Sequence, residues 1–214
     1  MRMNIRQNNG FTLIEVLIGL LMSSIVVFSL YNITKVQQDT YVAQDQVVAM
    51  QDNLRAAMLL AVREMRMAGY DPEGNANATI ITATGNTFQF TMDLDGNGVT
   101  TGSGEKITYS LYTDADGIQK LGRKSPALNR PVAEHINNIE FYYTLDDGSK
   151  ALAPADPAKV RTVQLTILAQ TKSADPNLTA PTSFTTPSGA TWNLPAGFKG
   201  RIATMSLQCR NMGL

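Results

Sequence analysis

The sequence predicts an α+β protein, in which one long N-terminal helix packs on an antiparallel β-sheet head domain. Between Asn32 and Ala68 there is neither proline nor glycine, and apolar residues recur at spacings close to three and four, which indicates an amphipathic helix. After Pro72 the pattern alternates with period two, and Gly, Asp, Asn and Pro clusters separate the alternating segments, as turns separate strands. A helical run followed by a run of strands is typical of the α+β class.

The composition excludes several classes of protein. Eighteen basic and eighteen acidic residues among 214 cancel, so the net charge gives no reason to expect nucleic acid as a partner. A single cysteine, Cys209, rules out an intramolecular disulfide and makes a cysteine metal site a poor interpretation. With one histidine, His135, histidine-based metal or acid–base chemistry is equally disfavoured.

The N-terminus combines a polar leader with a membrane-length apolar segment. The first ten residues carry only two charges, Arg2 and Arg6, and the run from Phe11 to Tyr31 carries one, Glu15. About twenty helical residues cover roughly 30 Å, the thickness of the hydrocarbon layer of a bilayer. Because the arginines precede the span, we expect the leader to stay in the cytoplasm and the rest to be exported.

The alternative for this segment is an ordinary secretory signal peptide. The apolar run is longer than the roughly 7–15 residues of such a peptide, and no small-residue cleavage site follows Tyr31. A carboxylate five residues into the span also costs roughly 2.5–3.5 kcal/mol on insertion scales, so Glu15 is a functional residue by default. We therefore expect the span to be retained.

The run Gly10-Phe11-Thr12-Leu13-Ile14-Glu15 resembles the type IV prepilin processing site. The resemblance implies cleavage by prepilin peptidase between Gly10 and Phe11, and N-methylation of Phe11. It also implies that Glu15 pairs with the new N-terminal amine of a neighbouring subunit. Such a pairing is physically reasonable, because two buried opposite charges offset each other's desolvation, whereas one charge alone is penalised.

The helical pattern continues beyond the span, until Gly69 and Pro72 supply the expected stop. An unbroken helix from Phe11 to Ala68 would be about 58 residues and roughly 87 Å long. The run from Arg63 to Pro72, Arg-Glu-Met-Arg-Met-Ala-Gly-Tyr-Asp-Pro, resembles the end of the long helix in the minor pilins called PilW. A weaker resemblance connects its first four residues to the type II secretion pseudopilin GspJ. Later segments around 138–143, 160–166 and 207–211 also resemble the PilW pattern.

We expect seven strands in the head, and a short helical turn at residues 131–138. Residues 153–157 and 173–195 are expected to be loops, the latter because of its four prolines and many Thr and Ser. The expected strands are Ile80–Ala83, Thr87–Met92, Lys106–Tyr112, Ile118–Leu121, Ile139–Leu145, Val160–Thr171 and Arg201–Gln208.

One segment of the head has the composition of a calcium-binding loop. Asp93, Asp95 and Asn97 place oxygen ligands at alternate positions, with glycines that permit a sharp turn, and Glu105 could complete the set. An EF-hand acid belongs twelfth from Asp93, where Gly104 stands, and the flanks are predicted strands. The alternative is a polar hairpin loop without a metal.

Other polar residues have plainer interpretations. The Asp-rich runs at 114–117 and 146–148 are expected turns, and His135 a surface or packed residue. Cys209 is expected to be a small buried hydrophobe, with a mixed disulfide to another periplasmic chain as the alternative. Because the sequence has no phosphate loop, HExxH, GxSxG or CxxC motif, we expect no enzyme activity and no organic cofactor.

These observations predict four regions: a leader at 1–10, a transmembrane and filament-core helix at 11–35, an amphipathic second half of the helix at 36–70, and a periplasmic β-rich head at 71–214. The resemblance implies a minor pilin of a type IV pilus, anchored in the bacterial inner membrane and then displayed on the cell surface. Its expected partners are prepilin peptidase, other minor pilins and the major pilin. A GspJ-like pseudopilin is the alternative, and the sequence leaves the choice, the place in the filament and the strand order open.

Overall fold

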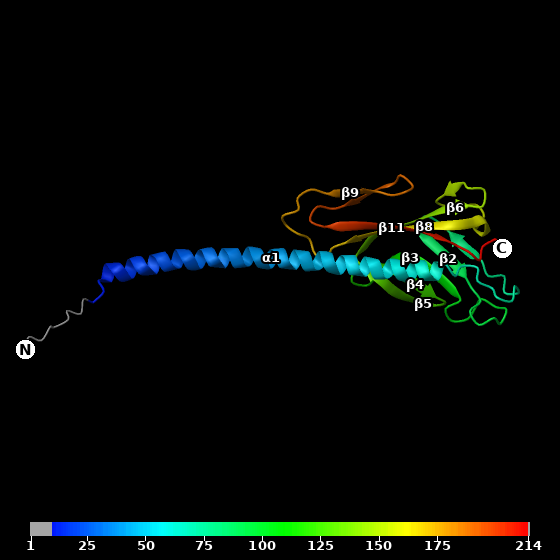
Figure 1. The fold of residues 1–214 in the computed structure, drawn as a ribbon, viewed down its shortest axis with the longest axis horizontal. Helices are drawn as coiled ribbons and strands as arrows, with labels where there is room; N and C mark the ends of the chain where they lie inside the picture. The colour runs from blue at the N-terminus through cyan, green and yellow to red at the C-terminus, as the bar shows by residue number, and fades with distance from the viewer. Residues whose placement is uncertain (1–9, 214) are drawn as a thin grey trace, which may run out of the picture. The chain divides into compact units, whose positions relative to one another are not determined.

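The computed structural model describes residues 10–213, so Arg2 and Arg6 of the leader lie outside the described part of the chain. The chain divides into two compact units, one ending at Asp45 and one formed by Gln46–Leu214. Helix α1, Leu13–Met65, contributes to both (Figure 1). The remaining elements are β1 Ile80–Ala83, β2 Thr87–Thr91, β3 Lys106–Thr113, β4 Gln119–Ser125, β5 Leu128–Glu134, β6 Ile136–Leu145, β7 Lys150–Ala151, the 3₁₀ turn η1 Pro157–Lys159, β8 Val160–Gln170, β9 Thr182–Thr185, β10 Thr191–Leu194 and β11 Gly200–Gln208.

The end of α1 is fixed by one glycine. The regular helix stops at Met65, three residues before the expected end at Ala68, and hydrogen-bonded turns carry the chain to Gly69. Gly69 has φ of 78°, in the left-handed region that glycine adopts without strain. A Cβ atom there would lie 2.7 Å from Sδ of Met212. The backbone angle therefore favours glycine at this position, and any larger residue would also have to displace the Met212 side chain.

The strands of the second unit form two larger sheets and a separate hairpin. Strands β1 to β5 make an antiparallel meander in sequence order, and β9 pairs with β10. The other large sheet has the order β11-β8-β6-β7, with β8 antiparallel to both β6 and β11. Each of the seven predicted strands corresponds to an observed one, and the α+β prediction of a long helix with an antiparallel head is confirmed.

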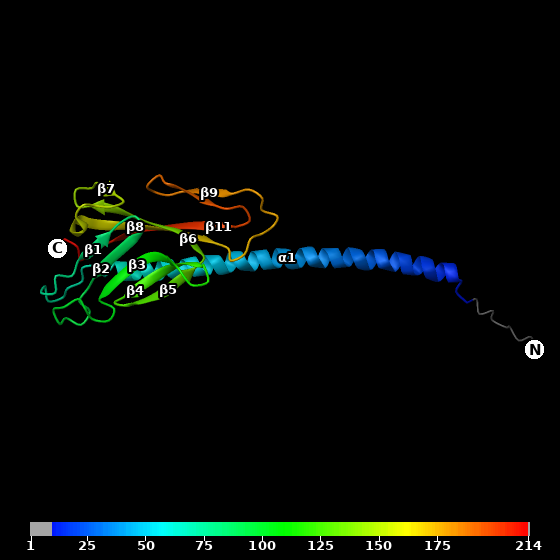
Figure 2. The same ribbon diagram turned by 180° about the vertical axis from the view of Figure 1, so that it is seen from behind.

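The core of the second unit joins the C-terminal part of α1 to both large sheets (Figure 2). The helix buries one side, and the sheets bury their inward-facing alternate residues. Phe88 lies at the centre, with its ring centroid 5.4–6.0 Å from those of three other aromatic rings, a spacing that stabilises aromatic clusters beyond area burial alone. The buried helical residues are Met50, Leu54, Ala57, Met58, Ala61, Val62 and Met65, and the three rings belong to Phe90, Phe141 and Tyr143.

Two expectations for the head are wrong. The expected helical turn at 131–138 is instead the end of β5 and the start of β6, joined at His135, which has φ of 55°. Histidine is one of the few non-glycine residues enriched in this left-handed conformation. The expected loop at 173–195 contains the β9–β10 hairpin. Its prolines lie outside the paired residues, so proline content concealed two short strands.

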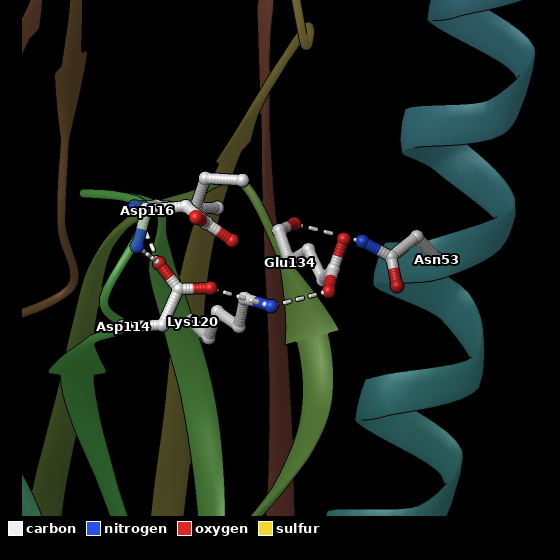
Figure 3. Close-up of polar contacts among 6 residues, drawn as sticks. Asn53, Asp114, Asp116, Lys120 and Glu134 are labelled. Atoms are coloured by element: carbon white, nitrogen blue, oxygen red, sulfur yellow. Dashed lines mark hydrogen bonds and ion pairs between the residues drawn. The ribbon is translucent and has the colours of Figure 1, made fainter.

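A small polar network joins the meander to α1 (Figure 3). Lys120 on β4 donates to Asp114 Oδ2 at 2.8 Å and to Glu134 Oε1 at 2.6 Å. The backbone carbonyl of Glu134 accepts a 2.8 Å hydrogen bond from the side-chain amide of Asn53 on the helix. The expected turn at Asp114–Gly117 is present, since Asp114 also accepts the backbone N–H of Asp116 and of Ile118.

Candidate functional site

The first turn of α1 is closed by Thr12 and Glu15. The Thr12 backbone N–H and hydroxyl each donate to Oε2 of Glu15 at 2.8 Å, and the Glu15 N–H donates to the Thr12 hydroxyl at 3.3 Å. This reciprocal pattern is a capping box, which satisfies the free N–H groups at a helix start. Glu15 therefore has a local structural role that the sequence analysis missed, although the Thr-x-x-Glu spacing could have indicated it.

The capping box leaves half of the Glu15 carboxylate free. Within residues 10–213, Oε1 accepts no hydrogen bond, and no cation lies within ion-pair distance of either oxygen. The predicted processing residues lie just before it, with Gly10 exposed and the Phe11 side chain 88% exposed. Gly10, Phe11 and Glu15 thus stand together at an accessible helix start.

From Phe11 to Val36 the surface of the first unit is mostly apolar and exposed within the described structure. Helix α1 contains an 18-residue window with a mean hydropathy of 2.4, none of it buried, so it is long and apolar enough to cross a membrane by length and composition. The serines of this stretch bond to their own helix: the hydroxyls of Ser23 and Ser29 donate to the carbonyls of Gly19 and Ile25. Such bonds let hydroxyls enter an apolar environment without leaving a donor unsatisfied.

The predicted calcium loop brings three of its four proposed ligands together. One carboxylate oxygen each of Asp93, Asp95 and Glu105 lies within 4.8 Å of the others. Asp93 and Glu105 are buried, and their oxygens accept backbone N–H groups of the same loop, among them Gly96 and Gly98 for Asp93. The fourth proposed ligand is Asn97. Its side-chain amide donates to Asp95, and its side-chain oxygen accepts the backbone N–H of Val99.

A second carboxylate of α1, Glu64, fastens the helix end to the meander. Its Oε2 accepts a 2.7 Å hydrogen bond from Nε of Arg123 and a 2.5 Å bond from the Tyr109 hydroxyl. Burial is the main cause that raises the pKa of Tyr109 well above its ordinary value, and the nearby Glu64 carboxylate adds to it. The phenol therefore stays protonated. In the Arg-Glu-Met-Arg run of residues 63–66, the glutamate therefore has a structural role: it links the end of the helix to the meander.

Glu140 holds the β9–β10 hairpin and was not singled out from the sequence. Its Oε2 accepts hydrogen bonds from the hydroxyls of Thr186 at 2.9 Å and Ser188 at 2.6 Å, while Oε1 is buried and has no partner in the described residues. Thr186 and Ser188 come from the turn between β9 and β10. The contact spans more than forty residues of sequence, so no local pattern could have revealed it.

Cys209 is buried immediately after β11, where its N–H donates to the carbonyl of Arg161. Burial raises the pKa of its thiol to about 12, so the reactive thiolate is scarce at neutral pH. This environment suits the small buried hydrophobe expected from the sequence and gives no support to the mixed disulfide.

Residues 5–31 match the family model described as the prokaryotic N-terminal methylation motif. Among solved structures, the chain is similar to a type IV-like pilin from Thermus thermophilus, with 18% sequence identity and a TM-score of 0.48 over 77% of this chain and 98% of that one. Comparison with curated protein sequences gives no match.

The motif covers the second half of the predicted leader and the start of α1, and it includes Gly10, Phe11 and Glu15. It indicates a pilin or pseudopilin role. The chain thus joins a prokaryotic N-terminal methylation motif at residues 5–31 to one long N-terminal helix and an antiparallel β-sheet head.

Proposed function

We propose that the chain is a PilW-like minor pilin that contributes to the initiation and assembly of a type IV pilus. Before assembly it is a single-pass protein of the bacterial inner membrane, with the head in the periplasm. Prepilin peptidase cuts after Gly10, and Phe11 is methylated. The mature subunit then joins other minor pilins and the major pilin through the first part of α1. On this view the protein is a structural subunit and not an enzyme.

The observation that carries the proposal is the Glu15 carboxylate oxygen without a partner among residues 10–213, at the start of an exposed apolar helix. A carboxylate in an apolar medium is costly unless a cation pairs with it. The N-terminal amine of a neighbouring subunit, released by cleavage after Gly10, would supply that cation. The apolar surface from Phe11 onward would supply the packing area between helices.

The first test is the mature N-terminus. Mass spectrometry of the chain purified from cells that contain prepilin peptidase should find a protein that begins with N-methylated Phe11. A chain that still begins at Met1 after exposure to the peptidase would contradict the proposal. So would a chain that begins after Tyr31, which signal peptidase would produce.

The second test separates the two roles of Glu15. Glu15→Ala removes both the charge and the capping-box acceptor, whereas Glu15→Gln keeps an acceptor that capping boxes accept equally well. If the charge pairs with a neighbour, both variants should enter filaments at least about tenfold less than the wild type, a factor that corresponds to about 1.4 kcal/mol. Wild-type incorporation of Glu15→Gln would refute the pairing, and normal incorporation of both would refute the docking role.

A GspJ-like pseudopilin of a type II secretion system remains the alternative, because the same processing and docking chemistry serves both assemblies. The pilin-like chains that co-purify with the mature protein distinguish them. Major and minor pilins of a pilus are expected; pseudopilins of a secretion system would transfer the proposal to the alternative.

We propose further that the loop from Asp93 to Glu105 takes a structural Ca²⁺. Three carboxylate oxygens within 4.8 Å of one another suit the 2.3–2.6 Å ligand distances of calcium. The melting temperature should then fall on chelation and rise again with Ca²⁺, and Asp95→Ala should abolish the response. Unchanged melting in the wild type would leave the polar hairpin loop as the full account, since backbone N–H groups already satisfy Asp93 and Glu105.

A further inference from the structure

The edges of the two large sheets differ in how well they are protected. Edge strands present unpaired backbone groups, and proteins usually block them with bulges, prolines, short strands or covering groups. The edge strand β1 contains an irregularity between Ile80 and Thr82, and β7 has only two residues. The edge strand β5 contains Pro131 and is contacted by Asn53 of the helix. All three edges are blunted.

Strand β11 is the exception among the edges of these two sheets. It is nine residues long, contains no proline, and pairs with β8 in one register without a bulge. Its middle residues Thr204, Met205 and Ser206 are all exposed, Met205 to 37%. Because alternate side chains point to opposite faces of a sheet, three consecutive exposed residues show that both faces are open at the middle of β11, which lies at the edge of its sheet.

The ladder to β8 fixes which backbone groups point outward. Thr171 donates its N–H to the carbonyl of Lys199, and Cys209 donates to Arg161, so odd-numbered residues of this strand exchange hydrogen bonds with β8. In an antiparallel pair these residues alternate with ones whose N–H and C=O point away. The outward groups therefore belong to the even-numbered residues, and those of Thr204, Ser206 and Gln208 have no partner among residues 10–213.

The open edge carries positive charge near both ends. Arg201 and Arg210 are exposed, and neither forms an ion pair within residues 10–213. By contrast, Lys199 pairs with Asp175, and Arg161 lies 3.9 Å from Asp146. An added strand with acidic residues near its ends would satisfy both the backbone groups and the two arginines.

We propose that β11 accepts an extended segment of a different filament subunit as an additional strand, with acidic side chains near the ends of that segment. Backbone hydrogen bonds provide affinity in this mode of recognition, and alternate side chains provide specificity. A second copy of this chain fits less well, because antiparallel pairing of β11 with itself brings Arg201 of one copy and Arg210 of the other to the same end. The partner's identity as a filament subunit rests on the proposed function; the edge does not.

The test uses the full chain in detergent micelles and a defined peptide probe. The probe is a nine-residue peptide, acetylated and amidated, that alternates threonine and valine between two terminal glutamates. It should bind and slow hydrogen exchange at the amides of Thr204, Ser206 and Gln208 at least about tenfold, because these amides gain acceptors. The amide of Met205, already bonded to β8, should change little. A peptide with terminal lysines should bind more weakly.

Because the even-numbered residues of β11 point their N–H groups away from β8, proline and alanine variants at these positions form a matched pair. Ser206→Pro removes an outward N–H and leaves the bonds to β8 intact, a position that tolerates proline at a sheet edge. It should weaken peptide binding at least about tenfold relative to Ser206→Ala. Thr204→Pro, with Thr204→Ala as its control, repeats the test if the first variant melts early. Equal affinity of folded Pro and Ala variants, absence of binding, or protection of other amides would overturn the proposal. None of these outcomes bears on Phe11 methylation, which tests the proposed function separately.

Discussion

Helix α1 has one backbone conformation from Leu13 to Met65, but its two ends differ in what their side chains contact. In the first unit the large apolar side chains are all more than half exposed from Phe11 to Val36, whereas Leu54, Met58 and Met65 are buried among strands of the same chain. The second half packs into the core of its own head, whereas the large apolar side chains of the first half are exposed within residues 10–213. The two carboxylates differ in the same way: one oxygen of Glu15 has no partner among residues 10–213, whereas Glu64 pairs with Arg123.

The largest expected difference is between the same substitution at two places on α1. Leu54→Ala should lower the unfolding free energy of the head by about 2–5 kcal/mol, as core truncations do, since Leu54 is 3% exposed. Leu17→Ala, at a side chain 56% exposed, should leave head unfolding unchanged but reduce incorporation into filaments. Denaturation followed by near-ultraviolet circular dichroism measures the first effect. Equal losses of head stability would break the comparison between the two halves.

A smaller loss of stability is expected when the contacts between Glu64 and the meander are removed. Glu64→Ala should cost about 2 kcal/mol, because it leaves a half-buried Arg123 and the Tyr109 hydroxyl without their shared acceptor. The control is Asp52→Ala, which breaks the exposed pair with Arg55 at 3.9 Å on the same helix and should cost less than about 0.5 kcal/mol. Urea titrations of both variants measure these costs. Similar values would show that Glu64 contributes no more than a surface charge.

Much of the fold could be predicted because local patterns determine it. The period-two segments gave strands such as Ile80–Ala83 at their observed bounds, and the Gly69 stop placed the helix end within three residues. Strand β5 was missed because Asn129, Arg130 and Pro131 do not alternate; they are extended because β4 pairs with them. The β9–β10 hairpin was missed because prolines surround its two short strands, and its contact with Glu140 could not be foreseen because that residue is distant in sequence.

The processing residues could be predicted for a different reason. Gly10, Phe11 and Glu15 lie within six positions, so their relation is visible without any tertiary structure. The open edge of β11 has no comparable signal, because whether a strand is central or at an edge depends on sheet order. Its outward amides could be assigned only from the hydrogen bonds that β11 makes with β8.

The smallest expected effect concerns the Lys120 network and depends on pH. The Lys120 ammonium, together with the Ile118 N–H, holds the pKa of Asp114 below its usual value. Stability from this carboxylate is therefore complete above its unfolded pKa of about 3.9 and is lost as the pH falls through the lowered folded pKa. The pKa of Lys120 is raised by Asp114 and Glu134, so its contribution is complete below about pH 10.4 and is lost as the pH rises through the raised value.

Asp114→Asn should accordingly lower the urea midpoint by a constant amount between about pH 5 and 10, and by progressively less towards pH 3. Asp116→Asn, in the same turn but without an ion pair to Lys120, is the control and should show no such dependence. The midpoints of both variants and the wild type, measured across this range, decide the matter. A difference for Asp114→Asn that persists undiminished at pH 3 would mean that the variant acts through the shape of the turn, because the Asp114 side chain accepts two backbone N–H groups there. The charge of Asp114 would then add little to the stability of the head.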